Sequence, residues 1–358
     1  MSGKQLSDIV VKMLRDNDPN RNKLKAILDA KSREVLDRFG RVAVSGFTDP
    51  QVISIFNDVK AYWKDVYRPA LITLSCEAIG GNALLAGDAS LVITLAAAGM
   101  GIHDDIIDKS ETSHFRRTIL GRRGIDRALL VGDLMLIKGL TTTMRFLQQE
   151  KITREQKDQL INAFQDFFLE IYEGALMDLS CRKNLDTAPE LYSNIIWKLT
   201  ADGEVCSKVG AILGGGTEEE TRALSEIGHR FGFVHHLSEE VKDSMNEEGG
   251  LPHRLEFESV PLPVLYAAKS SDKAFAKIKS ILQQPSASMH VSDIVKTCWE
   301  SRAFGYVYEI SKQNLDQAIL KLKALEPSPA RDTLMLMIKT SFRYLKLARD
   351  FENRYVGT

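Results

Sequence analysis

Apolar residues recur at three- and four-residue spacing along almost the whole of this 358-residue chain. That spacing places them on one face of an α-helix, so it predicts a succession of amphipathic and buried helices. We expect helices over 52–63, 71–79, 83–107, 128–147, 156–179, 192–213, 219–245, 261–268, 274–282, 291–310, 315–325 and 330–355. Glycine, proline and aspartate separate these segments, and none shows the alternation of a β-strand. The sequence therefore predicts an all-α fold, one large helical bundle whose sites lie between facing helices.

The composition allows one large core and shows no shift that marks a second globular unit. Hydrophobic residues make up 44% of the chain and charged residues 27%, which is ordinary for a globular protein. Residues 1–48 are polar and rich in lysine and aspartate, and we expect them to form a peripheral helical arm. Residues 49–358 are expected to form one all-α domain that carries the active site.

Charge and apolar patterning argue against several classes of partner. A net charge of −1 gives no reason to expect nucleic acid. The most apolar stretch, 83–107, is interrupted by Asp88 and ends in carboxylates, so we expect no transmembrane segment. The four cysteines are scattered without metal-binding spacing, which is typical of reduced thiols in a cytoplasmic protein.

Three carboxylates in five residues, Asp104, Asp105 and Asp108, directly follow this apolar stretch. Asp104 and Asp108 stand one turn apart and share a helix face. Like charges so close repel one another unless a cation lies among them, and hard oxygen ligands suit Mg²⁺. A charged helix end facing solvent is the alternative interpretation of the same spacing.

A second acidic cluster contains Glu239, Asp243 and Glu247 at i, i+4 and i+8, which predicts three carboxylates on one helix face. Alone it would be read as a solvated acidic stripe. If the two acidic faces oppose one another across a bundle, they form a clamp for several Mg²⁺ ions and a diphosphate. Basic residues that could complete such a site are Arg116, Arg117, Lys198 and Lys242.

These segments together resemble the trans-isoprenyl diphosphate synthases, or polyprenyl synthetases. HDDIID at 103–108 resembles the family's first aspartate-rich motif, DDxxD, and EEVKD at 239–243 occupies the place of the second. Further similar segments are GDLM at 132–135, GALMDL at 174–179, IIWKL at 195–199 and the C-terminal 318–334. The resemblance implies the class I isoprenoid-synthase fold, a homodimer, three Mg²⁺ per site and an allylic prenyl diphosphate substrate. It implies catalytic roles for Asp104, Asp105, Asp108 and Lys198.

The chain departs from the family where isopentenyl diphosphate, the second substrate, is bound. Asp65 and Val66 stand where the GGKRxRP motif has Lys and Arg, and Ala97 stands where a His is expected. The basic pair Arg116-Arg117 is displaced by three residues. An aspartate among the ligands of a diphosphate would repel it, so the site is expected to be missing or rebuilt.

Three functions are compatible with these departures. In the first, the protein would ionise one allylic diphosphate of twenty carbons or more and cyclise it, or transfer the prenyl group to an acceptor other than isopentenyl diphosphate. The spacing of Glu239, Asp243 and Glu247, which matches a metal-binding motif of class I terpene synthases, favours this interpretation. The alternatives are a conventional chain-elongating prenyltransferase and a non-catalytic regulatory subunit.

Small residues before DDIID bear on substrate length. Ala97, Ala98, Gly99 and Met100 leave room for a deep pocket, because in the similar family the size of such positions limits product length. Close packing of two helices also selects Ala and Gly, so both interpretations stay open.

Overall fold

Nearly all of the described chain is helical, as the apolar periodicity predicts. The structure is a computed structural model and describes residues 2–15, 18–113, 115–283 and 290–356. Its helices are α1 (Gly3–Arg15), α2 (Pro19–Val44), α3 (Pro50–Tyr62), α4 (Tyr67–Ala78), α5 (Ala83–Ile107), α6 (Ile119–Arg123), α7 (Ile125–Leu147), α8 (Arg154–Cys181), α9 (Pro189–Leu199), α10 (Ala201–Gly214), α11 (Glu218–Ser244), α12 (Leu251–Phe257), α13 (Leu262–Lys269), α14 (Asp272–Leu282), α15 (Val291–Glu300), α16 (Ala303–Ala324) and α17 (Pro329–Val356).

One short hairpin departs from the all-helical expectation. Strands β1 (Thr112–Ser113) and β2 (Arg116–Arg117) pair antiparallel directly after the DDIID segment. Phe115, at the turn, has a φ of 59°, a conformation that ends regular structure and reverses the chain. Two residues per strand are too few for an alternating pattern to be visible in the sequence.

Several helices begin at side chains that satisfy their first N–H groups. The Asp49 carboxylate accepts hydrogen bonds from the Gln51 and Val52 amides at 2.8 and 3.0 Å, so α3 starts at Pro50. Asn82 accepts from the Leu84 amide at 3.0 Å and starts α5. Thr153 and Thr217 form capping boxes at the starts of α8 and α11. These local signals are why the bounds of α3, α5 and α11 lie close to those expected.

Two expected helices are each broken in the structure. The helix expected over 192–213 is divided at Thr200, whose ψ of 14° is not helical and whose hydroxyl donates to the Trp197 carbonyl at 2.9 Å. The helix expected over 291–310 is divided at Arg302, which has a φ of 58°. After that break, α16 runs without interruption through the gap expected at 311–314. Neither Thr200 nor Arg302 is a residue type that signals a break in sequence.

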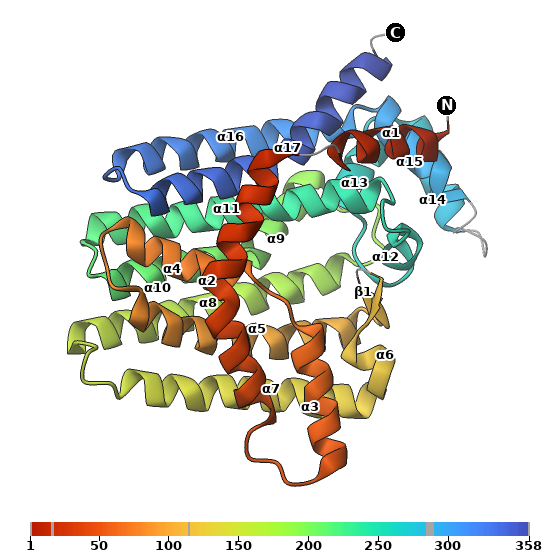
Figure 1. The fold of residues 1–358 in the computed structure, drawn as a ribbon. Helices are drawn as coiled ribbons and strands as arrows, with labels where there is room; N and C mark the ends of the chain where they lie inside the picture. The colour runs from red at the N-terminus through yellow and green to blue at the C-terminus, as the bar shows by residue number, and fades with distance from the viewer. Residues whose placement is uncertain (1, 16–17, 114, 284–289, 357–358) are drawn as a thin grey trace.

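The bundle packs around α4, α5, α10 and α11, and α7 and α8 lie along one side of it (Figure 1). Close approach of α5 to α7 depends on glycine: a Cβ added to Gly99 would lie 2.8 Å from the Gly132 carbonyl oxygen. By length and composition α5 is the one described helix that could cross a membrane, but 61% of its most apolar window is buried inside the bundle. Helix α2 crosses the front of the bundle and packs on α4, α5 and α17.

Helix α16 is capped by a distant carboxylate. Arg302 at its N-terminus offers no side-chain cap, and Glu352 of α17 instead accepts the Phe304 and Gly305 amides at 3.0 and 2.7 Å. Glu352 is only 1% exposed. Burial raises the pKa of this carboxyl from an ordinary value of 4.5 to about 7, against the opposing effect of the two amides.

Glu352 is therefore expected to make stability fall as pH rises. The folded state binds its proton more tightly than the unfolded state, so its contribution declines between about pH 4.5 and pH 7. Relative to Glu352→Gln, the wild-type free energy of unfolding should fall by about 3 kcal/mol at most over that window. Urea unfolding at pH 5 and pH 7.5 measures the difference, and an equal pH dependence of the two proteins would contradict this role.

Candidate active site

A cavity of about 290 Å³, here named the carboxylate cavity, brings the two acidic clusters together. Asp104 and Asp108 reach it from the C-terminal end of α5, and Glu239 and Asp243 from the last turns of α11. Carboxylates in the last turn of a helix lie at the negative end of its dipole, which adds to their mutual repulsion. The expected pairing of the two clusters thus holds for these four residues.

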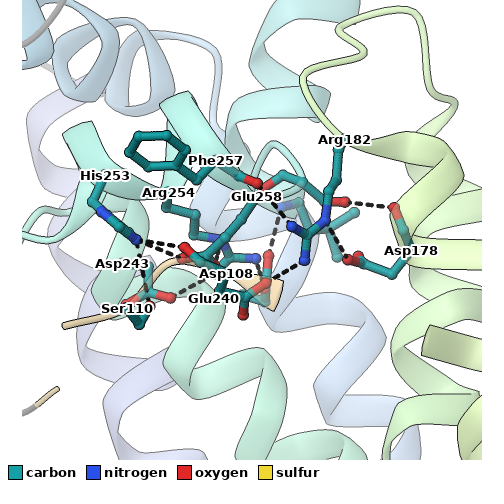
Figure 2. A network of polar contacts seen from close by, with 12 residues as sticks. Asp108, Ser110, Asp178, Arg182, Glu240, Asp243, His253, Arg254, Phe257 and Glu258 are labelled. Atoms are coloured by element: carbon teal, nitrogen blue, oxygen red, sulfur yellow. Dashed lines mark hydrogen bonds and ion pairs between the residues drawn. The ribbon is translucent and has the colours of Figure 1, made fainter. Parts of the chain in front are cut away.

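Two arginines lie between the carboxylates (Figure 2). Arg182, which directly follows α8, pairs with Asp108 and donates to the Ile107 and Phe257 carbonyls, both at 3.0 Å. Arg254 of α12 pairs with Asp243 and Glu240. These long-range partners were not visible in sequence, although the segment before Arg182 was identified as family-like.

Glu240 is the most deeply buried carboxylate of this network. It is 1% exposed, pairs with Arg254 and accepts the Leu262 amide at 2.7 Å. Burial alone would raise its pKa, but Arg254, His236 and the Leu262 amide together hold it at about 2. Glu240 therefore stays ionised and fixes Arg254 against α11.

The open carboxylates have the opposite electrostatics. Burial and the neighbouring Asp108 and Asp105 carboxylates raise the pKa of Asp104 to about 8, although part of its side chain meets solvent in the cavity. Burial also raises the pKa of Glu258, which lines the same cavity, to about 7. Anions that are desolvated and repel one another gain most from a bound cation.

This donor set fits Mg²⁺ in part. Among the described residues, no three Asp, Glu, His or Cys side chains are grouped to hold one ion. Mg²⁺ commonly takes one or two carboxylates together with water and substrate phosphate oxygens, so a complete protein cage is not required. Asp104 and Asp108 on one wall and Glu239 and Asp243 on the other are the residues that would hold it.

Other expected site residues lie elsewhere. Helix α11 ends at Ser244, so Glu247 does not share the face of Glu239 and Asp243, and it accepts a hydrogen bond from Tyr344 at 3.0 Å. The expectation of a three-carboxylate face is wrong at Glu247 for this reason. Asp105 also lies outside the lining of the cavity and acts electrostatically on Tyr62.

The expected basic ligands do not line the carboxylate cavity either. Lys198 pairs with Glu173 at 2.8 Å, and Lys242 pairs with Glu239 at 2.6 Å. Arg116 donates to the Ala61 carbonyl at 2.7 Å on the outer surface. Arg117 lies beside Arg116 in the same exposed hairpin. The basic side chains that line the carboxylate cavity are instead Arg182 and Arg254.

A second, almost wholly apolar cavity of about 450 Å³ lies between α5, α7 and α8. Ala96 and Ile93 line it, so it begins about 12 Å along α5 from Asp104. Ala98 and Gly99 do not line it: Ala98 packs with buried residues of α2, α3 and α7, and Gly99 contacts α7. Their placement favours the helix-packing interpretation. Ala97 and Met100 are half-buried and do not line this cavity.

Ala96 is therefore the better position at which to limit the length of a bound prenyl chain. Ala96→Phe is expected to reduce the volume of the apolar cavity and to shorten the longest prenyl chain that the protein binds or forms by at least one isoprene unit. Ala98→Phe is the matched control, because overpacking at that buried site should cost about 1–3 kcal/mol of stability and leave product length unchanged. Mass spectrometry of the products decides, and an unchanged length in Ala96→Phe would show that the chain grows elsewhere.

Comparison with known proteins identifies the family of this chain. A family model described as "Polyprenyl synthetase" matches residues 64–298, about two thirds of the chain. The chain belongs to the polyprenyl synthetase family. It is 25% identical over 313 residues, 86% of this chain and 94% of its relative, to a short chain isoprenyl diphosphate synthase of Methanothermobacter thermautotrophicus. It is 26% identical to a geranylgeranyl diphosphate synthase of Methanosarcina mazei, covering 76% of this chain and 82% of that one.

Solved structures confirm the all-α isoprenoid-synthase fold. The geranylgeranyl pyrophosphate synthetase of Pyrococcus horikoshii matches with a TM-score of 0.76 and 25% identity, over 90% of this chain and 99% of that one. A polyprenyl synthase of Caulobacter crescentus, solved with calcium and isoprenyl diphosphate, matches with a TM-score of 0.74 at 18% identity. The chain is thus a prenyltransferase-like enzyme. Its relatives are named as diphosphate synthases, which favours chain elongation over the cyclisation or alternative-acceptor reaction expected first.

Asp65, one of the altered family positions, has a structural role in this chain. Asp65 accepts the Tyr67 amide at 3.0 Å and pairs with Arg68 at 2.9 Å. Arg68 also pairs with Asp202 of α10 at 2.7 Å, so two carboxylates already neutralise it. These groups tie the start of α4 to α10, so Arg68 of the usual motif for the second substrate is already neutralised.

Proposed function

We propose that this protein is a Mg²⁺-dependent, chain-elongating prenyltransferase that joins an allylic prenyl diphosphate to isopentenyl diphosphate. The observation that carries the proposal is the pairing of α5 and α11 carboxylates across one cavity, about two helical turns from an apolar cavity. Relatives that match most of this chain are named as isoprenyl or geranylgeranyl diphosphate synthases, which supports elongation.

The proposed reaction needs charge stabilisation at one end of the substrate and exclusion of water at the other. Mg²⁺ held by Asp104, Asp108, Glu239 and Asp243 would stabilise the negative charge that develops on the departing diphosphate. Arg182 adds a cation at the same wall. The allylic C–O bond breaks, the double bond of isopentenyl diphosphate supplies the electrons for the new C–C bond, and a proton leaves to the departing diphosphate. Apolar walls protect the cation from water.

Three Mg²⁺ ions per site, which the family resemblance implies, belong to this proposal. The calcium in the Caulobacter crescentus structure supports a divalent cation in this fold. Diphosphate contacts from Lys198, Lys242, Arg116 and Arg117 are also proposed. Lys198, Lys242 and Arg116 would each have to leave the present partner. We propose that residues 49–358 form the catalytic domain, with 1–48 as its arm, in a cytoplasmic protein.

A homodimer is proposed from the exposed apolar face of α7 and α8. Leu130 is 68% exposed, Leu169 64% and Leu176 65%, and the neighbouring apolar cavity is lined by the same two helices. A second copy of the chain would cover this face and close the cavity. Leu130→Glu with Leu169→Glu is expected to halve the mass measured by light scattering. A wild-type monomer, or a double variant of unchanged mass, would contradict the dimer.

Pyrophosphate release tests the proposed reaction. With Mg²⁺ and an allylic diphosphate of ten to twenty carbons, release should require isopentenyl diphosphate and equal the amount consumed. Release without isopentenyl diphosphate, with hydrocarbon or alcohol products, would favour cyclisation or hydrolysis. No release by wild type or by Asp104→Ala would leave the regulatory subunit.

A further inference from the structure

The hairpin that follows DDIID and helix α6 together carry a cationic surface, here named the arginine face. Its residues line an open depression of about 600 Å³ and are Phe115, Arg116, Arg117, Arg122, Arg123 and, from the neighbouring α3, Asp58. Asp58 pairs with both Arg122 and Arg123, at 3.4 and 2.6 Å. One carboxylate thus faces four guanidinium groups, in a chain whose net charge is −1.

Charges around the arginine face do not cancel its excess of cations. The rest of segment 109–127 adds two basic and two acidic residues. Asp105 acts electrostatically on Tyr62, as Arg116 does, but Asp105 does not line the face. Arg116 donates to the Ala61 carbonyl at 2.7 Å, an interaction that leaves its charge in place. The arginine face therefore attracts anions.

Hydrogen bonds hold the hairpin and α6 in place. The Thr118 amide donates to the Glu111 carbonyl at 3.0 Å, and the Thr118 hydroxyl donates to the Ser110 carbonyl at 2.7 Å. Arg123 donates to the Ser54 hydroxyl of α3 at 2.9 Å. A surface that is fixed in this way loses little conformational entropy when it binds a partner.

Phe115 is an exposed aromatic residue with a strained backbone at the turn of the hairpin. Its side chain is 82% exposed, the highest value among the large hydrophobic residues that the structure describes. Its φ of 59° lies in the left-handed region, which favours glycine over a residue with a Cβ. Solvation and backbone preference both disfavour phenylalanine at this position. An exposed apolar residue that is held in an unfavourable conformation indicates a role in binding.

We propose that the arginine face docks on an anionic lipid membrane, with Phe115 inserted below the lipid phosphates and the arginines at their level. An aromatic ring among cations fits this partner, because a lipid surface presents anionic phosphates directly above an apolar layer. A soluble anion would contact the arginines and leave Phe115 in water. The docking is peripheral, since α5 stays buried in the bundle. The hairpin directly follows DDIID, so docking brings the end of α5 to the membrane (Figure 1).

Co-sedimentation with lipid vesicles tests the arginine face without substrate or metal. The full chain is mixed with vesicles of phosphatidylcholine that contain about one third phosphatidylglycerol, and separately with vesicles of phosphatidylcholine alone. Binding should require the anionic lipid and should weaken as the salt concentration rises.

Variants of the face separate insertion of the ring from attraction by the arginines. Phe115→Gly removes the ring and suits the positive φ, so it should weaken binding about tenfold while melting no lower than wild type. Arg117→Gln and Arg122→Gln should each weaken binding about fivefold, because one cation at an anionic lipid surface contributes about 1 kcal/mol. Leu320→Ser and Arg222→Gln are the matched controls and should bind like wild type. Leu320 is 71% exposed on α16, Arg222 is exposed on α11, and neither lines the arginine face.

The outcomes decide the docking independently of the proposed reaction, because no substrate is present. Weaker binding by Phe115→Gly and Arg117→Gln, with both controls unchanged, would support it. Equal binding of wild type to both kinds of vesicle, or no binding to either, would overturn it. Full binding by Phe115→Gly would also overturn it, because the arginines alone would then account for the attraction, as they would for an acidic protein surface.

Discussion

Replacing Asp104 with asparagine should reduce kcat by about 10³-fold or more, equivalent to roughly 4 kcal/mol of transition-state stabilisation. The substitution keeps the size and shape of the side chain and removes the charge that would hold the cation. Loss of a cation ligand in the carboxylate cavity leaves the departing diphosphate without full neutralisation. Steady-state kinetics at saturating Mg²⁺ measures the effect.

The same substitution should leave the stability of the metal-free protein unchanged or raise it. Burial and the nearby Asp108 and Asp105 carboxylates raise the pKa of Asp104 to about 8. In the metal-free protein, the contribution of this carboxyl to the stability of the fold therefore declines as pH rises toward 8. Metal-free Asp104→Asn should therefore melt at or above the wild-type temperature at pH 8.5, while added Mg²⁺ raises the melting temperature of wild type more. Asp158→Asn, an exposed position on α8, is the control. A kcat of Asp104→Asn within tenfold of the wild-type value would contradict the catalytic role of Asp104.

Replacing Arg254 with methionine should cost about 3–5 kcal/mol of stability, because it leaves a buried carboxylate without its partner. Glu240 is 1% exposed and its remaining polar contacts are the Leu262 amide and His236 at 3.7 Å. Asp243 and Tyr192 would lose the same guanidinium. Denaturant unfolding gives the free energy directly.

A double-mutant cycle separates the ion pair from the packing of Arg254. Glu240→Gln can still accept the Leu262 amide, so Arg254→Met with Glu240→Gln should recover a substantial part of the loss. Arg222→Met, at an exposed position of α11, should change stability by less than about 0.5 kcal/mol. A loss below about 1 kcal/mol in Arg254→Met would show that Glu240 is solvated or protonated when Arg254 is absent.

The parts of this fold that follow from local sequence were predictable, and those that depend on distant contacts were not. Helix α5 has the expected bounds because Asn82 caps it and its apolar run ends at DDIID. The meeting of Asp104 with Asp243 followed from two acidic segments and a family resemblance. The pairing of Arg254 with Glu240 has no sequence signal, because it joins helices that the chain brings together only on folding.

The main error in the predicted site comes from the position at which α11 ends. The i, i+4, i+8 spacing assumed that α11 continues to Glu247, but Asn246 has a φ of 57° and the chain turns there. Lys198 was identified by its family-like segment, yet its pairing with Glu173 depends on how α9 packs against α8. Spacing alone does not place charges on a common wall once a helix has ended.

Isotope incorporation tests the central claim most directly. The purified protein is incubated with Mg²⁺, an unlabelled allylic diphosphate and ¹³C-labelled isopentenyl diphosphate, and the products are weighed by mass spectrometry. The expected result is a series of longer prenyl diphosphates, each carrying one labelled unit for every five carbons added. Consumption of the allylic diphosphate with no label in any product would contradict chain elongation.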